Sequence, residues 1–162
     1  MNPLRPDVVF DSNTLFQAIV RADSPAAEAL RLMERNEITL HSSRATLREF
    51  RRIVGYRRIR ERYPQLTRDS VDEFLAWLLY RGELVKRVPR AIRYPRDPAD
   101  EPFLDLAVAV SADFLLSRDH DLLALASDHS LVAKALRKRL PRLRIVTPEE
   151  FLGQMADRRS SN

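Results

Sequence analysis

The sequence contains no cysteine and only three glycines. Without thiols, the protein cannot have disulfides, thiolate metal sites, iron-sulfur clusters or a cysteine nucleophile, so any metal must be held by oxygen or imidazole. The glycines, Gly55, Gly82 and Gly153, are too widely separated to form a phosphate-binding glycine loop. A nucleotide-binding function of that type is therefore excluded.

Long apolar runs are also missing. No stretch is long enough to cross a bilayer, and the first residues lack the apolar run of a secretory signal. We therefore expect a cytoplasmic protein with no membrane partner. The 162 residues, 44% of them hydrophobic, suffice for one compact domain with a real core. We expect this domain to span residues 1–154 and residues 155–162 to form a flexible tail.

The charge balance is basic. The chain has 28 Lys and Arg against 23 Asp and Glu, a formal net charge of +5. Most of the cationic side chains are arginines, which favour bidentate contacts with phosphate. A polyanionic partner is consistent with this excess.

The hydrophobic pattern alternates between strands and helices. Strands are predicted at residues 8–10, 38–40, 84–88, 114–117 and 143–146, with helical patterns between them. Residues 56–64 are predicted to be a helix end and loop, and residues 89–102 an ordered proline-rich loop. Strands that are apolar throughout indicate a parallel sheet covered on both faces. The expected fold class is therefore α/β, a three-layer α/β/α sandwich with a central parallel sheet.

Four acidic residues are predicted to meet beyond the carboxyl ends of these strands, where such folds bind ligands. Asp11 and Asp119 follow strands, Glu49 lies on a helix, and Asp100 precedes the helix that begins near Phe103. Gathering carboxylates is costly unless they hold a cation. Mg²⁺ and Mn²⁺ prefer oxygen ligands. A divalent metal site that hydrolyses phosphodiesters is the leading hypothesis.

Each acid taken alone also has an ordinary interpretation. Asp11 and Asp119 could simply cap helices, and Glu49 could pair with neighbouring arginines on a surface. Asp100 and its neighbour Asp97 could be turn residues. Only their expected convergence on one crevice favours the metal site.

Further polar residues occupy the same predicted edge. Asn13, Ser117 and Asp97 are candidate supporting residues that could hydrogen-bond a carboxylate or a bound water. Asp121 could be an additional metal ligand or a first-turn residue favoured by the helix dipole. Arginines that follow Glu49 could guide a nucleic-acid backbone or form a solvent-exposed helix end; the candidates are Arg51, Arg52, Arg57 and Arg58.

The sequence resembles the PIN-domain family, in particular the branch of VapC-like toxin ribonucleases from bacterial toxin-antitoxin systems. The motifs are VFDSN at residues 9–13, ATLREF at 45–50, RDPADEPFL at 96–104, ADFLLSRDHDLL at 112–123 and RIVTPEEFL at 144–152. The resemblance covers almost the whole chain and implies a PIN-like α/β/α fold.

The resemblance also implies a site and a reaction. The acidic quartet of the family falls on Asp11, Glu49, Asp100 and Asp119, and Asp97 and Asp105 are alternatives for the third position. The implied reaction is Mg²⁺- or Mn²⁺-dependent cleavage of single-stranded RNA. The implied partners are RNA, an inhibitory antitoxin and a second copy of the chain. The alternative function is a catalytically inactive PIN-fold module that binds RNA or protein.

Overall fold

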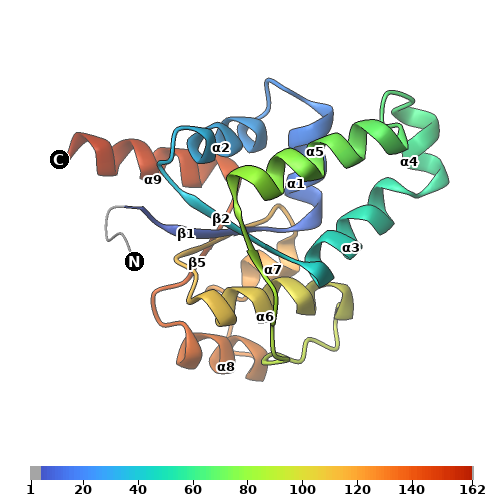
Figure 1. The fold of residues 1–162 in the computed structure, drawn as a ribbon. Coiled ribbons are helices and arrows are strands. Elements are labelled where there is room, and N and C mark those ends of the chain that lie inside the picture. The colour runs from blue at the N-terminus through green and yellow to red at the C-terminus, as the bar shows by residue number, and fades with distance from the viewer. Residues whose placement is uncertain (1–4, 162) are drawn as a thin grey trace.

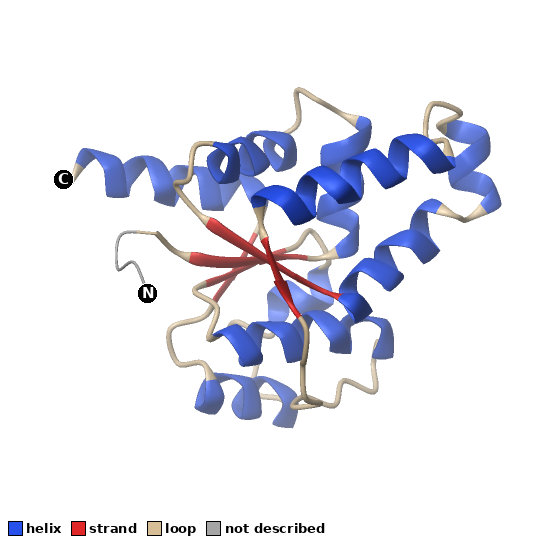
Figure 2. Cartoon of the chain, in the orientation of Figure 1, coloured by secondary structure: helices blue, strands red, loops and turns tan. Residues whose placement is uncertain are grey.

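The computed structural model describes residues 5–161 and shows a parallel sheet between two layers of helices (Figures 1 and 2). Its strands are β1 (Asp7–Phe10), β2 (Thr39–Ser43), β3 (Glu83–Val85), β4 (Phe114–Leu116) and β5 (Arg144–Val146). They lie in the order β3-β2-β1-β4-β5, and every neighbouring pair is parallel. The strand order therefore reverses between β1 and β4, and the predicted three-layer fold class is confirmed.

The central strands are apolar throughout because both of their faces are covered. In β1, Val8 and Phe10 enter one hydrophobic core, while Val9 enters the other. In β4, Phe114 and Leu116 join the first core and Leu115 joins the second. Alternate residues of one strand thus hold two helical layers together.

The first layer contains most of the helices. They are α1 (Ser12–Val20), α2 (Pro25–Glu34), α3 (Arg44–Val54), α4 (Arg57–Arg62), α5 (Arg68–Arg81) and α9 (Pro148–Ser160). Polar side chains cap their first turns: Ser24 caps α2, Ser43 caps α3, and Thr147 forms a capping box with Glu150 on α9. Each cap satisfies backbone N–H groups that have no partner inside the helix.

The second layer covers the opposite face of the sheet. It consists of α6 (Glu101–Val110), α7 (His120–Ala124) and α8 (Leu131–Arg139), preceded by a single 3₁₀ turn, η1 (Pro98–Asp100). Residues 86–97, here called the β3–α6 loop, connect β3 to this turn. In Figure 1 the loop descends across α6 and then turns back to the start of that helix.

Four local predictions were inaccurate. The second strand extends to Ser43 instead of ending at residue 40. Residues 57–62 form α4 instead of a loop; this helix buries no residue, so no apolar period marks it. β3 ends at Val85 instead of residue 88, although both valines pack against the second core. Residues 155–160 continue α9 instead of forming a tail, because Met155 is buried in the first core. Asn162 and residues 1–4 lie outside the described residues.

Within residues 5–161, no helix has both the length and the apolar composition that a membrane crossing requires.

Candidate metal centre

All four predicted acids line one small cavity of about 140 Å³ beyond the ends of β1 and β4. Asp11 comes directly after β1 and Asp119 lies just past β4, the neighbouring strand, while Glu49 comes from α3 and Asp100 from η1. Ser12, Asn13, Arg52 and Asp97 line the same cavity. The structure thus brings together carboxylates that are separated by up to about a hundred residues in the sequence.

Asp11 is held at the base of this cavity. Its backbone N–H donates to the Leu116 carbonyl of β4 at 3.0 Å, and its Oδ1 accepts from the Thr14 N–H at 2.8 Å to cap α1. Its Oδ2 accepts from the Ser117 hydroxyl. Burial raises the pKa of Asp11, the hydrogen bonds from Ser117 and Thr14 oppose this effect, and the charge of Asp119 adds to it. A cation here would replace the solvation that burial removes.

Asp119 is oriented in a similar way. Its Oδ1 caps α7 by accepting from the N–H groups of Asp121 at 2.8 Å and Leu122 at 3.2 Å. Its own N–H donates to Ser117 Oγ at 2.9 Å, so this buried serine joins Asp11 to Asp119. Within residues 5–161, Asp119 Oδ2 accepts no hydrogen bond and is free to bind a ligand. Capping a helix and lining the cavity are therefore compatible roles.

Asp100 carries the strongest electrostatic signal. Its Oδ2 is buried and has no hydrogen-bond partner among the residues that the structure describes. Burial raises the pKa of Asp100 to about 7, and the negative charges of Asp97, Asp119, Asp11 and Glu49 contribute to the shift. A carboxylate in such surroundings lacks a positive counter-charge, and a cation would supply it.

Glu49 pairs with Arg52 of the same helix. Both of its carboxylate oxygens accept from Arg52 Nε, at 3.1 and 3.0 Å, and its side chain is only 15% exposed. Because Arg52 also lines the cavity, it supplies positive charge next to the acids. The surface pairing considered from the sequence is thus present, but it lies at the cavity wall.

Of the three alternatives for the third acid, two line the cavity and one does not. Asp100 and Asp97 line the cavity, and Asp97 also caps η1 by accepting from the Ala99 N–H at 3.1 Å. Asp105 is buried, and its Oδ1 accepts from the N–H groups of Ala91 and Ile92 at 2.8 and 2.9 Å. Its role is therefore to anchor the β3–α6 loop.

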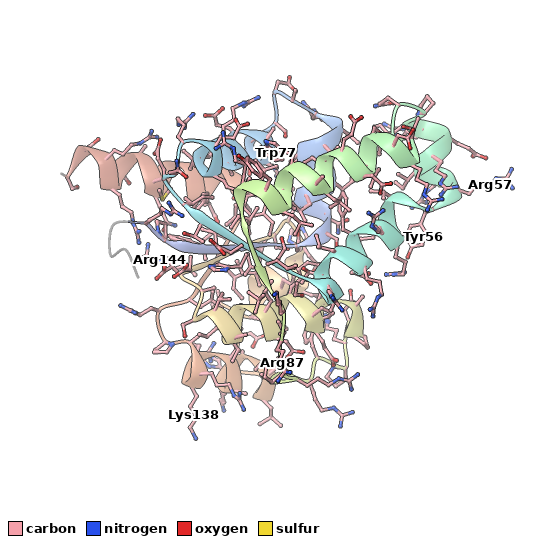
Figure 3. All side chains as sticks on the ribbon, viewed as in Figure 1. Tyr56, Arg57, Trp77, Arg87, Lys138 and Arg144 are labelled. Atoms are coloured by element: carbon pink, nitrogen blue, oxygen red, sulfur yellow. The ribbon has the colours of Figure 1, made fainter. Side chains whose placement is uncertain are left out.

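Asp121 and three of the predicted nucleic-acid-binding arginines are not among the described residues that line the cavity. Asp121 forms an ion pair with Arg96 at 3.2 Å. Arg51 pairs with Asp72 and Arg57 pairs with Glu61, both at 2.7 Å. Arg58 is exposed and has no ion pair within the described part of the chain. Figure 3 shows Tyr56 and Arg57 at the outer end of the α3–α4 corner.

Three residues have roles that the sequence pattern did not predict. Ser12 lines the cavity with a buried hydroxyl that has no partner among residues 5–161. Asp105 and Glu101 accept backbone N–H groups of the β3–α6 loop, the second from Tyr94 at 2.8 Å. A signal for the two acids was available, because the buried backbone N–H groups of a loop without regular secondary structure need acceptors.

The donor set suits a hard divalent cation in an open site. Within residues 5–161, no three His, Asp or Glu side chains are arranged as a closed ion-binding group. Mg²⁺ commonly keeps several waters and uses only one or two carboxylates, so a closed group is not required. The oxygen ligands, the unpartnered Asp100 Oδ2 and the raised pKa values of Asp11 and Asp100 together fit such a cation.

Comparison with known proteins agrees with this geometry. Residues 7–121 match the family model described as the PIN domain, a range that contains every acid of the cavity. The chain therefore belongs to the PIN-domain family, as its motifs predicted. PIN domains are generally nucleases and typically use divalent metal ions.

A solved structure has the same fold. It is the structure of VapBC2 from Rickettsia felis, bound to a DNA fragment from the VapBC2 promoter. The two chains are 16% identical, the match covers 86% of this chain and 96% of that chain, and the TM-score is 0.52. No curated protein matches the sequence significantly.

Proposed function

We propose that this protein is a metal-dependent endoribonuclease that hydrolyses phosphodiester bonds in single-stranded RNA. The observation that carries the proposal is the convergence of Asp11, Glu49, Asp100 and Asp119 on one cavity, with Asp100 lacking a counter-charge. Membership of the PIN-domain family supports the nuclease assignment. An RNA substrate also agrees with the cytoplasmic location expected from the sequence.

Asp11, Asp100 and Asp119 would hold Mg²⁺ or Mn²⁺, and Glu49 would complete the acidic wall. When bound, the cation supplies positive charge beside the phosphate and favours ionisation of the attacking water. The protein keeps Asp11 and Asp119 in place through helix caps and Ser117, so little reorganisation is needed for binding. Arg52 lies close enough to the cavity to contact a substrate phosphate.

We further propose that this ribonuclease is the toxin of a toxin-antitoxin pair. Its motifs resemble the VapC-like branch, and VapBC2 supports the proposal by its shared fold. In such a pair, a small antitoxin would cover the acidic cavity, and a second copy of the chain would complete a homodimer.

The alternative is a catalytically inactive PIN-fold module. It is favoured by the contact between Arg52 and both oxygens of Glu49, which occupies one acid without a metal. The two functions differ in metal binding: calorimetric titration with Mn²⁺ would detect binding by the nuclease, whereas the inactive module would bind RNA without it.

The decisive experiment is cleavage of a fluorescent single-stranded RNA with Mn²⁺ by the wild type, Asp11→Asn and Asp119→Asn. Asparagine caps helices about as well as aspartate, so these variants lose charge while keeping the cap. We expect each to lose at least about a hundredfold in rate, because several kcal/mol of charge stabilisation depends on the metal. Asp157→Asn, an exposed acid on α9, should cleave normally. Equal cleavage by all four proteins would exclude the proposed site.

A further inference from the structure

The β3–α6 loop carries a regular row of arginines that the candidate metal centre does not use. Arg87, Arg90, Arg93 and Arg96 recur at every third residue, with Pro89 and Pro95 between them. Proline favours an extended backbone, and an extended helix of the polyproline type has three residues per turn. For residues 87–94, which precede a turn at residues 95 and 96, that geometry would put side chains three residues apart on one side at intervals of about 9 Å.

Burial shows that the loop presents these arginines to solvent. The four arginines are exposed, whereas Ile92 and Tyr94 are buried in the second core. Val88 and Ala91 also pack against that core. In Figure 3, Arg87 lies on the α6 side of the sheet, opposite the side that carries Trp77.

The loop is anchored although it has no regular secondary structure. Asp105 accepts the N–H groups of Ala91 and Ile92, and Glu101 accepts that of Tyr94. Both acids belong to α6, which packs against β1 and β2. The arginine row is therefore held in place before any ligand arrives, which lowers the entropy cost of binding.

The arginines in this row are nearly all unpaired. Within residues 5–161, Arg87, Arg90 and Arg93 form no ion pair and donate no side-chain hydrogen bond, and Arg96 pairs only with Asp121. In the first layer, Arg51, Arg52 and Arg57 have acidic partners, whereas Arg58 has none within the described residues. Beside the row, a cavity of about 730 Å³ is lined by two of the arginines, Arg90 and Arg93, by apolar residues and by one acid, Glu101, which accepts the Tyr94 N–H. This is an open, positively charged surface.

The row leads directly to the acidic cavity. Arg96 is followed by Asp97, which lines that cavity, and η1 then ends at Asp100. A polyanion lying along the loop would therefore arrive with one of its phosphates at the four acids. An acidic peptide would follow the arginines as well, and either polyanion would need a cation at this end to offset the repulsion of the acids. Membership of the PIN-domain family favours the nucleic acid.

We propose that Arg87, Arg90, Arg93 and Arg96 form a binding track for the phosphate backbone of the RNA substrate. The track rests on the proposed ribonuclease function, because that function defines the substrate class. It binds RNA through phosphates and not through bases, so it contributes affinity and direction but no sequence preference.

The test measures RNA binding without catalysis. Fluorescence anisotropy of a labelled single-stranded RNA is recorded in EDTA at several salt concentrations, with the wild type, Arg90→Ala/Arg93→Ala and Arg90→Lys/Arg93→Lys. The matched control is Arg68→Ala/Arg81→Ala, which removes the same charge from exposed positions on α5 in the other layer that form no ion pair within residues 5–161. Melting temperatures establish that every variant is folded.

We expect the alanine variant to bind about tenfold more weakly at low salt. The slope of log K against log salt should decrease by about 1.4, because each contact with a single-strand phosphate contributes about 0.7. The lysine variant should keep the slope, because the charges remain. The control variant should match the wild type.

Equal weakening by the alanine and control variants would overturn the track, since only net charge would then matter. So would unchanged RNA binding by the alanine variant, or loss of binding only to a labelled polyglutamate peptide, which would indicate an acidic protein partner. The result is independent of hydrolysis: RNA that binds along the loop but is not cleaved with Mn²⁺ contradicts the nuclease and leaves the track intact.

Discussion

Ser117 illustrates how single residues prepare the site. Its buried hydroxyl donates to Asp11 and accepts from the backbone of Asp119, so one side chain fixes the relative positions of two carboxylate-bearing segments. A hydroxyl can do both because it is a donor and an acceptor at once. The sequence placed Ser117 among the supporting residues; its link to both acids depends on β1 and β4 being neighbours.

Asp100 leads to a prediction about pH. Its pKa rises from an ordinary 3.8 to about 7 in the folded protein, so the folded state keeps a proton that the unfolded state has released. Its contribution to stability is therefore most favourable below about pH 4 and is lost as pH rises toward 7. In EDTA, the melting temperature of the wild type should fall across this range relative to that of Asp100→Asn.

Thermal unfolding of both proteins at several pH values measures this difference. Burial also raises the pKa of Asp11, and because the charges of Asp11 and Asp100 interact, the comparison measures Asp100 together with this coupling. Asp157→Asn serves as the control and should follow the wild type. Parallel curves for wild type and Asp100→Asn would mean that Asp100 titrates normally.

At the junction between α5 and β3, Gly82 lies closer to neighbouring backbone than Gly55 or Gly153 does. A Cβ atom at Gly82 would lie 2.7 Å from the Leu40 carbonyl oxygen and 2.9 Å from that of Leu78. Neither backbone group can move without disturbing β2 or α5. Gly153 on α9 has no atom within 4 Å of the same position. A side chain at position 82 would therefore collide with backbone, whereas one at position 153 would not.

Gly82→Ala should lower the free energy of unfolding by about 1–3 kcal/mol, because the added methyl group forces the backbone to shift. Gly153→Ala should raise it by about 0.5–1 kcal/mol, since alanine is the better residue inside a helix. Urea unfolding of both variants and the wild type tests the pair. Stabilisation by both substitutions would show that the α5–β3 junction has room.

The elements also show where sequence patterns succeed. Helix caps such as Ser24 and Thr147, followed by proline, marked the starts of α2 and α9 correctly. α4 was missed because none of its residues is buried, so the segment has no apolar face to mark it. Local patterns record what a segment buries, so a segment that buries nothing gives no periodic signal.

For the whole molecule, the site is a product of topology. Four segments meet at one edge only because β1 and β4 are adjacent at the reversal of strand order. A cation bound there would connect α1, α3, η1 and the β4–α7 turn. Metal binding should therefore stabilise the entire fold and not just one element.

Addition of Mn²⁺ should raise the melting temperature of the wild type, by an amount equivalent to about 2.7 kcal/mol when the ion is at a hundred times its Kd. The double variant Asp11→Asn/Asp119→Asn should lose this response, while Asp157→Asn should keep it. Scanning calorimetry with Mn²⁺ and then with EDTA provides the measurement. An equal shift in all three proteins would place the bound ion elsewhere.

The sequence by itself determined the layer architecture and most helix starts, because apolar periodicity and capping are local properties of the chain. It also predicted an acidic site but left Asp97, Asp100 and Asp105 as alternatives for the third acid. Tertiary structure alone decided that Asp105 anchors a loop while Asp100 faces the cavity, and that Arg52 pairs with Glu49 at the cavity wall. These roles depend on which buried donors and charges lie nearby in space. Such neighbours are set by packing between distant segments, and no local pattern records them.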